Sequence, residues 1–413
     1  MKTRFVALIE PLHIKALFGY FFTAILFITI LSIPLANVQI YPKSMMILML
    51  LVSLYIVLLK KTRIFLNTLF LYKDLIALMA ILGVCIISSM LDNRVASFYS
   101  WEGVCQVVFM HFFGFITLLF LYQEGFFGKM GKKLIFFLML ISFGIELISG
   151  FAQIFFQLSF IEGIFGSLQS GLTGTTINRN IFGFYMAFGT VLTLLKIIRS
   201  QGTINIYYPI LLTLFFIGLL FSYSRASWVF VFVFMFSYTI IFFKQVKQRD
   251  ALLFLFVLFL FAIAFVFSSA LSDRFLSIIE GDSSSRFEIW QQTVEFIKQK
   301  FLLGYGVRNF DFEVMGAYFP HNFILDILYS VGILGFSVSA AFLVLTCKEI
   351  IKTNLIHLPL LLSFFMILQF DHDITSRRVL SMLMLLAFFI FSRRVDENNA
   401  KMGKNYNDFD TKY

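Results

Sequence analysis

Two arginines and a histidine stand where the sequence passes between apolar runs and polar segments. Arg225 lies in the stretch Ser222–Trp228 between two apolar segments, Arg286 begins a charged stretch, and His321 follows Pro320 just before another apolar run. A guanidinium group binds phosphate oxygens through paired hydrogen bonds, and a histidine titrates near neutral pH and transfers protons. These residues are our first candidates for anion binding and proton transfer.

Each candidate also has a structural alternative. For Arg225 the alternative is a lone arginine that extends to the membrane interface, as arginines beside a span often do. Two features favour a function for it: Arg225 is confined to a tight turn, and a charge within the membrane is by default a candidate for function. Arg286 is either a tolerated surface cation or, together with the backbone N–H groups of a helix start, part of an anion site. His321 is either a hydrogen-bonding interface residue or a base. Asp326 lies off the i+4 spacing and is not taken as the partner of His321.

Other polar residues give weaker signals. Asn178-Arg179-Asn180 suits the start of a helix, because asparagine is a good N-cap. Arg377 and Arg378 follow Asp371-His372-Asp373 in a cluster that serves either structural pairing or substrate binding. Glu146 and His111 lie inside apolar runs, as in a proton-coupled transporter.

A glycine pair and the three cysteines give no further sign of chemistry. Gly304-Tyr305-Gly306 is predicted to form a simple turn. The cysteines, Cys85, Cys105 and Cys347, have no metal-ligand spacing. We therefore expect no metal and no cofactor.

The composition requires a membrane around these residues. Of 413 residues, 60% are hydrophobic and only 14% are charged, and the mean hydropathy is +0.89. Soluble domains are about 45–50% apolar and about 25% charged. The net charge of +10 is spread singly between apolar runs, which argues against a nucleic-acid partner.

About twelve apolar runs are long enough to be spans, which need about 20 residues each. We predict an all-α, polytopic transmembrane helical bundle, with residues 1–413 as a single transmembrane domain. The expected spans are 17–37, 44–59, 74–91, 103–122, 134–158, 180–198, 205–222, 226–243, 251–271, 322–347, 354–370 and 376–392.

The distribution of Lys and Arg gives an orientation. If the N-terminus is in the cytoplasm, the cytoplasmic loops and the two terminal segments hold about two-thirds of the 33 basic residues. Basic residues favour the cytoplasmic side of a membrane. Both termini are then cytoplasmic, and 393–413 is expected to be a disordered tail. The extracytoplasmic side carries the large loop 272–320 between the ninth and tenth spans.

An amphipathic helix is expected within this loop. Its apolar residues recur at spacings of three and four, which is typical of a helix. Ser285 and Glu288 form a predicted capping box at its start. The apolar stripe is expected to lie on the bundle or at the membrane surface and consists of Phe287, Trp290, Val294, Ile297 and Phe301.

Four short motifs, in this order, resemble the O-antigen ligase and O-antigen polymerase superfamily of bacterial envelope glycosyltransferases. The motif-bearing part is 178–336, and 205–340 is the expected family core. The motifs are Asn178-Arg179-Asn180, then Ser224-Arg225-Ala226-Ser227-Trp228, then Ser285–Trp290 with Leu303–Phe310, and finally His321-Asn322 with Asp326 and Gly332–Gly335.

The resemblance implies a function. Such proteins move a glycan from an undecaprenyl diphosphate carrier to an acceptor sugar hydroxyl at the outer face of the bacterial inner membrane, without a metal. The acceptor is lipid A-core in ligases and another carrier-linked glycan in polymerases of O-antigen, capsule or exopolysaccharide. The family's important residues align with Arg225, Arg286 and His321. Asn180, Arg308, Arg377 and Arg378 are further candidates for substrate binding.

Two other classes of function compete with this one. A transporter of lipid-linked glycans would place charges at mid-membrane depth and show inverted repeats, whereas these charges gather on one face and no repeat is evident. A non-catalytic membrane scaffold would not bring Arg225, Arg286 and His321 to one outer site.

Overall fold

The fold is known from a computed structural model that describes most of the chain. The described residues are 11–33, 40–93, 110–126, 131–156, 171–176, 178–200, 204–269, 271–273, 276, 286–307, 309–310, 320–369 and 377–401. Within these ranges the regular structure is entirely helical.

The helices follow the apolar runs closely. Each of the twelve expected spans overlaps a helix, and α4 occupies a stretch expected as a loop. The helices are α2 (Pro11–Leu31), α3 (Ile40–Leu58), α4 (Thr62–Leu71), α5 (Lys73–Asp92), α7 (Gly114–Gln123), α8 (Gly131–Phe155), α9 (Arg179–Arg199), α10 (Tyr207–Phe221), α11 (Arg225–Ile241), α12 (Gln248–Phe267), α14 (Arg286–Gln299), α16 (Phe323–Thr353), α17 (His357–Leu368) and α18 (Arg377–Lys401), with a 3-10 turn η4 (Gly174–Thr176).

The all-helical architecture is thus confirmed, with five helices in the described ranges long and apolar enough to cross a membrane. These are α5, α8, α9, α12 and α16. The remaining apolar helices are shorter, so the count of twelve spans stays a prediction. At the chain's far end, α18 continues to Lys401. The first part of the segment expected to be disordered is therefore helical.

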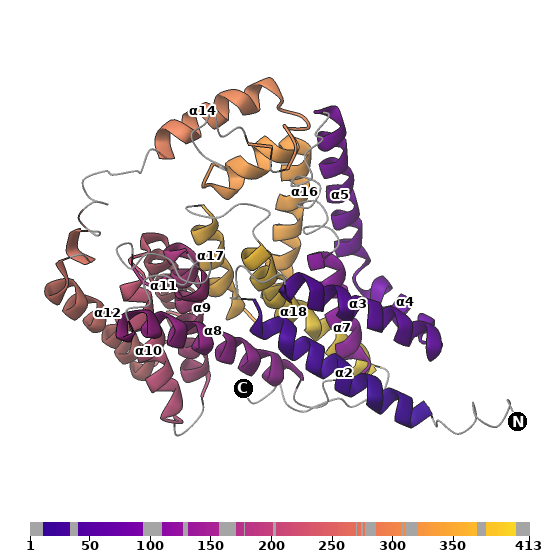
Figure 1. Cartoon of the computed structure of the whole chain (residues 1–413), viewed down its shortest axis with the longest axis horizontal. Helices are drawn as coiled ribbons and strands as arrows, with labels where there is room; N and C mark the ends of the chain where they lie inside the picture. Colours follow the sequence, from indigo (N-terminus) through magenta and orange to yellow (C-terminus); the bar gives the residue numbers. More distant parts are fainter. Residues whose placement is uncertain are drawn as a thin grey trace, which may run out of the picture.

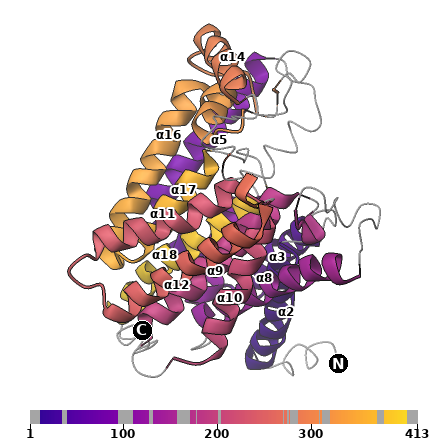
Figure 2. The same cartoon turned by 90° about the vertical axis from the view of Figure 1, so that its left-hand side faces the viewer.

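The helices pack as a broad bundle with α14 lying across its top (Figures 1 and 2). The central helix is α9, which is buried over 89% of its most apolar 18-residue stretch. It packs against α10 and α11, and α11 packs against α17. A helix that is apolar on all sides belongs in such an interior position.

Aromatic rings join the helices around α9. Phe184 of α9 meets Phe230 of α11 at 6.0 Å and Phe364 of α17 at 5.5 Å between ring centroids, both edge to face. This geometry is favourable for aromatic quadrupoles. Because Phe184 and Phe230 lie near the starts of their helices and Phe364 near the end of its own, the starts of α9 and α11 lie at the same end of the bundle as the end of α17.

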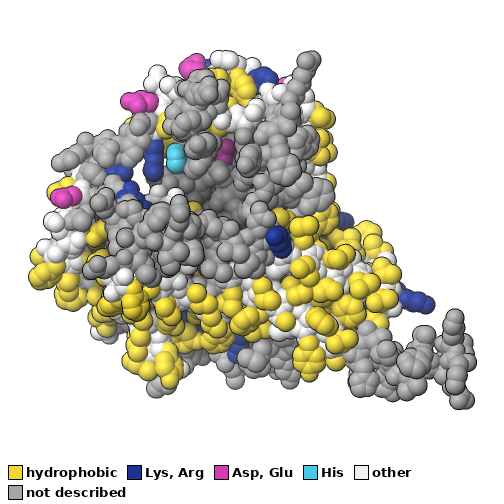
Figure 3. Space-filling model, viewed as in Figure 1, with side chains coloured by type: hydrophobic (Ala, Val, Ile, Leu, Met, Phe, Trp, Pro, Cys, Tyr) yellow, Lys and Arg dark blue, Asp and Glu magenta, His cyan; other side chains and the backbone are white. Residues whose placement is uncertain are grey.

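The sides of the bundle are apolar and exposed (Figure 3). On α12, Leu255, Phe259 and Phe267 are 59%, 60% and 84% exposed, and only 17% of that helix's apolar window is buried. Apolar surface on this scale marks contact with a partner or a membrane. We assign it to lipid because it covers helices of membrane-spanning length.

Ion pairs close one end of the bundle, which we call the α18 end. Arg394 of α18 reaches Asp74 at 3.1 Å and Glu349 at 2.8 Å, which joins the start of α5 to the end of α16. Two further pairs lie in segments that were expected, like these, on the cytoplasmic side: Lys132–Asp396 at 2.7 Å and Lys61–Glu124 at 3.3 Å. These contacts agree with the alternation of loops inferred from the basic residues.

The opposite end, which we call the α14 end, is organised by a sharp break in α16. Gly332 has φ of 63° and separates 323–331 from 333–353, and the two parts run in different directions (Figure 1). The amides of Tyr305 and Gly306 donate to the carbonyls of Tyr329 and Ser330 at 2.6 and 2.9 Å. Backbone groups released by the break therefore find partners in the segment that follows α14.

The end of α5 is tied to the same segment. Asn93 donates to the Gly304 carbonyl at 2.9 Å and Ser89 to the Ser330 carbonyl at 2.7 Å. Lys300 donates to the Asn93 side chain and lies 3.7 Å from Asp92. These bonds hold α14 and the break of α16 on top of α5.

Replacing Gly332 by alanine is expected to destabilise the α14 end. The added Cβ atom would lie 2.3 Å from the Leu302 carbonyl oxygen. The alanine would also have to keep the positive φ of Gly332, and such backbone strain costs about 1–3 kcal/mol. Thermal unfolding of the purified protein in detergent should shift to lower temperature. Gly144→Ala is the control, because a Cβ atom there meets nothing within 4 Å. An equal drop in unfolding temperature in both variants would contradict the role of Gly332 in joining α16 to the segment after α14.

Candidate active site

The turn between α10 and α11 presents Arg225 at the α14 end. Tyr223 has a positive φ of 52°, and the Ser224 amide donates to the Ser222 hydroxyl at 3.2 Å. Trp228 fastens α11 back onto α10 by donating to the Leu219 carbonyl at 3.3 Å. The tight helical hairpin expected here is therefore present, and Arg225 is the first residue of α11.

The start of α9 lies directly against this turn. Ser227 donates to the Asn180 carbonyl at 3.4 Å. A Cβ atom on Gly183 would come within 2.7 Å of Ser222 Oγ and Ser224 Cβ, so only glycine permits this approach. Asn178 caps α9, as expected, by accepting from the Asn180 amide at 2.8 Å. Asn180 and Arg225 are thus brought together.

Glu146 of α8 anchors the segment that leads into α9. Its carboxylate accepts from the Thr175 amide at 2.7 Å and from the Thr175 hydroxyl at 2.6 Å. Gln153 accepts from the amides of Thr173 and Gly174 at 3.1 and 2.9 Å. A buried carboxylate with these bonds has a structural task, which removes one of the residues that hinted at proton transport.

The second part of the site is built by α14. Arg286 shares a helix face with Trp290, Thr293 and Ile297, and Thr293 and Ile297 are buried. Trp290 donates through Nε1 to the Pro320 carbonyl at 2.8 Å. Since His321 is the next residue, this bond brings the start of α14 to His321.

His321 itself occupies a strained position. Its φ is 52°, and among the described residues only Lys60, Tyr223 and His321 are non-glycine residues with positive φ. Asn322 immediately starts α16 and caps it by accepting from the Leu325 amide at 3.0 Å. Backbone strain of this kind concentrates at functional sites, and two of the three cases lie in this site.

Asp326 belongs to the interior of α16. It is buried and accepts from Ser330 at 3.3 Å. The contact stabilises the short helical part before Gly332.

The two parts lie at the same end of the bundle. The end of α17 lies beside the starts of α9 and α11, as the aromatic contacts show, whereas the start of α17 follows the end of α16 at the α18 end. Lys and Arg side chains gather in the upper left part of the face seen in Figure 3. The candidate residues therefore share the α14 end, with Asn180 near Arg225 and Arg286 near His321.

A pattern of arginines went unnoticed in the sequence. Two helices with a described N-cap begin with an arginine, Arg179 after Asn178 and Arg225 after Ser224, and the described parts of α14 and α18 also start at an arginine, Arg286 and Arg377. A cation at a helix start opposes the helix dipole, and its recurrence fits an anion held between helix starts. The signal becomes readable only when helix boundaries are known.

Several candidate residues lie outside the part of the chain that the structure describes. Ser285 and Arg308 fall outside the described residues, and so do the side chains of Arg377 and Arg378. His111 is buried in a π-helical turn that precedes α7, away from any of the contacts above.

One comparison with known proteins bears on this site. The model of the family described as O-antigen ligase matches residues 210–340. The matched segment contains Arg225, Arg286 and His321. No curated protein matches the chain. The resemblance to the O-antigen ligase and polymerase superfamily is thereby confirmed, and it supports an enzyme of this general type.

Variants of Glu146 separate a structural role from proton transfer. Glu146→Ala should leave the partly buried Thr175 amide without its acceptor and cost about 1 kcal/mol of stability or more. Glu146→Gln should be nearly neutral, because an amide still accepts from the Thr175 amide. Thermal unfolding and glycan transfer measured for both variants test this; a Gln variant that folds normally but is as inactive as the Ala variant would contradict it.

Proposed function

We propose that this protein transfers a glycan from undecaprenyl diphosphate to a sugar hydroxyl at the extracytoplasmic face of the bacterial inner membrane. The acceptor we favour is lipid A-core, as in O-antigen ligases. The main support is the gathering of Arg225, Arg286 and His321 at the α14 end, within the segment 210–340 that matches the ligase family. The α14 end is, on this proposal, the extracytoplasmic end.

The arginines are suited to the leaving group. As the bond between the sugar and the diphosphate breaks, negative charge grows on the departing diphosphate. Arg225 and Arg286 are the first described residues of α11 and α14, and the first backbone N–H groups of a helix have no partner within it. Such preorganised donors stabilise developing charge. We add Arg179, which begins α9 beside Arg225, as a third cation for the diphosphate.

His321 is suited to the acceptor. The acceptor hydroxyl attacks the anomeric carbon of the donor sugar, the carbon–oxygen bond to the diphosphate breaks, and the hydroxyl proton passes to the imidazole. A histidine is the usual residue for this proton transfer near neutral pH. The bond from Trp290 to Pro320 fixes the backbone beside His321, which limits how far the base can move from the arginines.

The membrane supplies the donor directly. The polyprenyl tail stays in the hydrocarbon, so the reacting diphosphate must lie at the interface. The α14 end adjoins the end of α5, where Asp92 lies 3.7 Å from Lys300. The exposed apolar residues of α5 continue up to the neighbouring Leu91, which is 64% exposed. The candidate site is therefore at the height where a lipid headgroup would meet it.

Replacing His321 by alanine should abolish transfer without loss of expression, because the acceptor hydroxyl loses its base. His357→Ala is a matched control, since His357 begins α17 at the α18 end, just after the end of α16. Transfer is measured with membranes carrying the lipid-linked donor. Full activity of the His321 variant at normal expression would overturn the assignment.

The same residues would serve a polymerase of the same superfamily, which differs in its acceptor. Deleting the gene should separate the two. Loss of all surface polymer, with carrier-linked chains accumulating, is expected for a ligase. Single repeat units on the core would instead establish a polymerase and exclude lipid A-core as the acceptor of this enzyme.

A further inference from the structure

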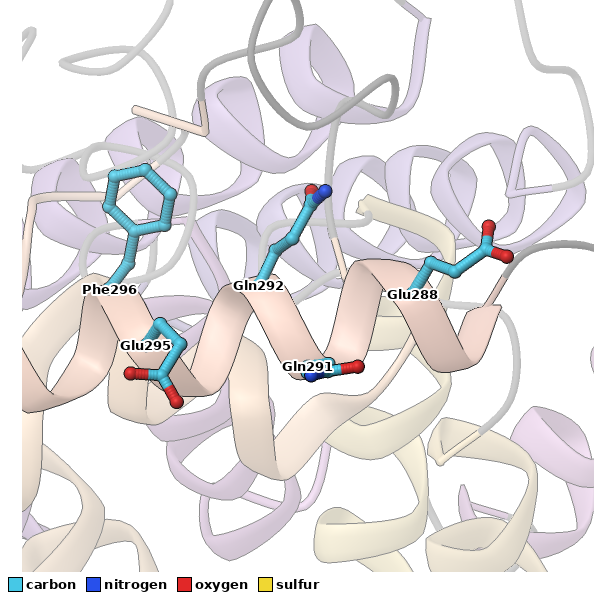
Figure 4. Close-up of a pocket in the computed structure, with 5 residues that line it drawn as sticks. All are labelled: Glu288, Gln291, Gln292, Glu295 and Phe296. Carbon is cyan, nitrogen blue, oxygen red and sulfur yellow. The ribbon is translucent and has the colours of Figure 1, made fainter.

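The face of α14 that points away from Arg286 carries a groove. Its lining consists of Glu288, Gln291, Gln292, Glu295 and Phe296, and these side chains stand along the helix in a row (Figure 4). Spacings of three and four put these residues on one side. Thr293 and Ile297, which share a face with Arg286, are buried on the other. The groove is therefore distinct from the residues assigned to catalysis.

The side chains in the groove have the chemistry of a sugar-binding surface. Carboxylates accept from hydroxyl groups, and amides both accept from and donate to them. The partly buried ring of Phe296, which packs against Tyr305 and Tyr329, adds an apolar contact at the edge of the groove. The rise from Glu288 to Glu295 is about 10 Å at the spacing of an α-helix, which suits a short oligosaccharide. The row therefore offers several polar contacts and one apolar contact to an extended, hydroxyl-rich chain.

Two other kinds of ligand fit less well. Glu288 and Glu295 are two helical turns apart, about 10 Å along the axis, whereas a cation needs oxygen ligands within about 2.6 Å of it. Apolar partners have a different flank of the same helix, where Phe287 and Val294 are 66% and 38% exposed. The groove thus favours neither a metal nor a lipid chain.

The charge of the row selects among sugars. Glu288 carries a negative charge on this side, and Glu295 adds a carboxylate whose charge is partly offset by an exposed pair with Lys298 at 2.7 Å. An acidic sugar, such as a uronic acid, would meet like charge here. Neutral and amino sugars would not.

We propose that this groove binds the donor glycan, two or more sugars away from the diphosphate, and selects neutral or amino sugars over acidic ones. The inference rests on the proposed function, because the donor must be a lipid-linked glycan. Its placement follows from α14 itself: Arg286 at the first residue faces the diphosphate, and Glu288 lies two positions further along. A glycan leaving the diphosphate passes from one face of α14 to the other.

Binding is tested on the full-length protein in nanodiscs by saturation-transfer NMR, without any transfer reaction. The probes are maltotetraose and chitotetraose as neutral oligosaccharides and tetragalacturonate as an acidic one. At least one neutral probe should bind and tetragalacturonate should not. Gln291→Ala combined with Gln292→Ala should weaken neutral binding at least ten-fold, while Val294→Ala, exposed on the same helix outside the groove, should leave it unchanged.

A second variant tests the charge selection. Glu288→Gln combined with Glu295→Gln keeps the shape of the row and removes its charge, so tetragalacturonate should now bind. Absence of binding to both neutral probes, equal binding by the Gln291/Gln292 variant, or stronger binding of the acidic probe to the unaltered protein would each overturn the proposal. His321→Ala should bind the neutral probe normally, so failure of the proposed chemistry is distinguished from failure of the groove.

Discussion

The break in α16 is the interaction on which the α14 end depends. Inside a bilayer, interrupted helices are tolerated only where the released backbone groups find partners. Here the partners are the Tyr305 and Gly306 amides for the carbonyls of Tyr329 and Ser330. In return, the Ile333 amide donates to the Phe301 carbonyl at 2.9 Å. The same bonds that satisfy α16 therefore fix the segment that carries α14 over the bundle.

This arrangement explains how a membrane bundle can hold polar chemistry at one end. Helix starts bearing arginines are unfavourable in isolation, because the dipole and the guanidinium have the same sign. They are held in place by contacts that do not involve the arginines, such as Glu146 with Thr175 and Ser227 with Asn180. On the proposed function, these helix starts are therefore positioned without help from the substrate.

The helices were predictable from the sequence, because they depend on local patterns. Apolar runs predicted every expected span as a helix, and the spacing of Trp290 and Ile297 predicted α14. Long-range pairings were not predictable. Gly304-Tyr305-Gly306 was interpreted as a simple turn, yet it bonds to residues more than twenty positions away. Glu146 looked like a proton carrier because its partner Thr175 lies beyond the same helix.

The tether between Lys300 and the end of α5 has a mechanical consequence. The 20 residues of α5 give a length of about 30 Å, close to the thickness of the hydrocarbon layer. Since the segment that follows α14 is tied to the end of this helix, the length of α5 sets the distance between that segment and the start of α5 at Lys73. On the proposed function, a thicker or thinner bilayer would move a lipid-linked donor relative to the α14 end, so membrane thickness would affect the rate of transfer.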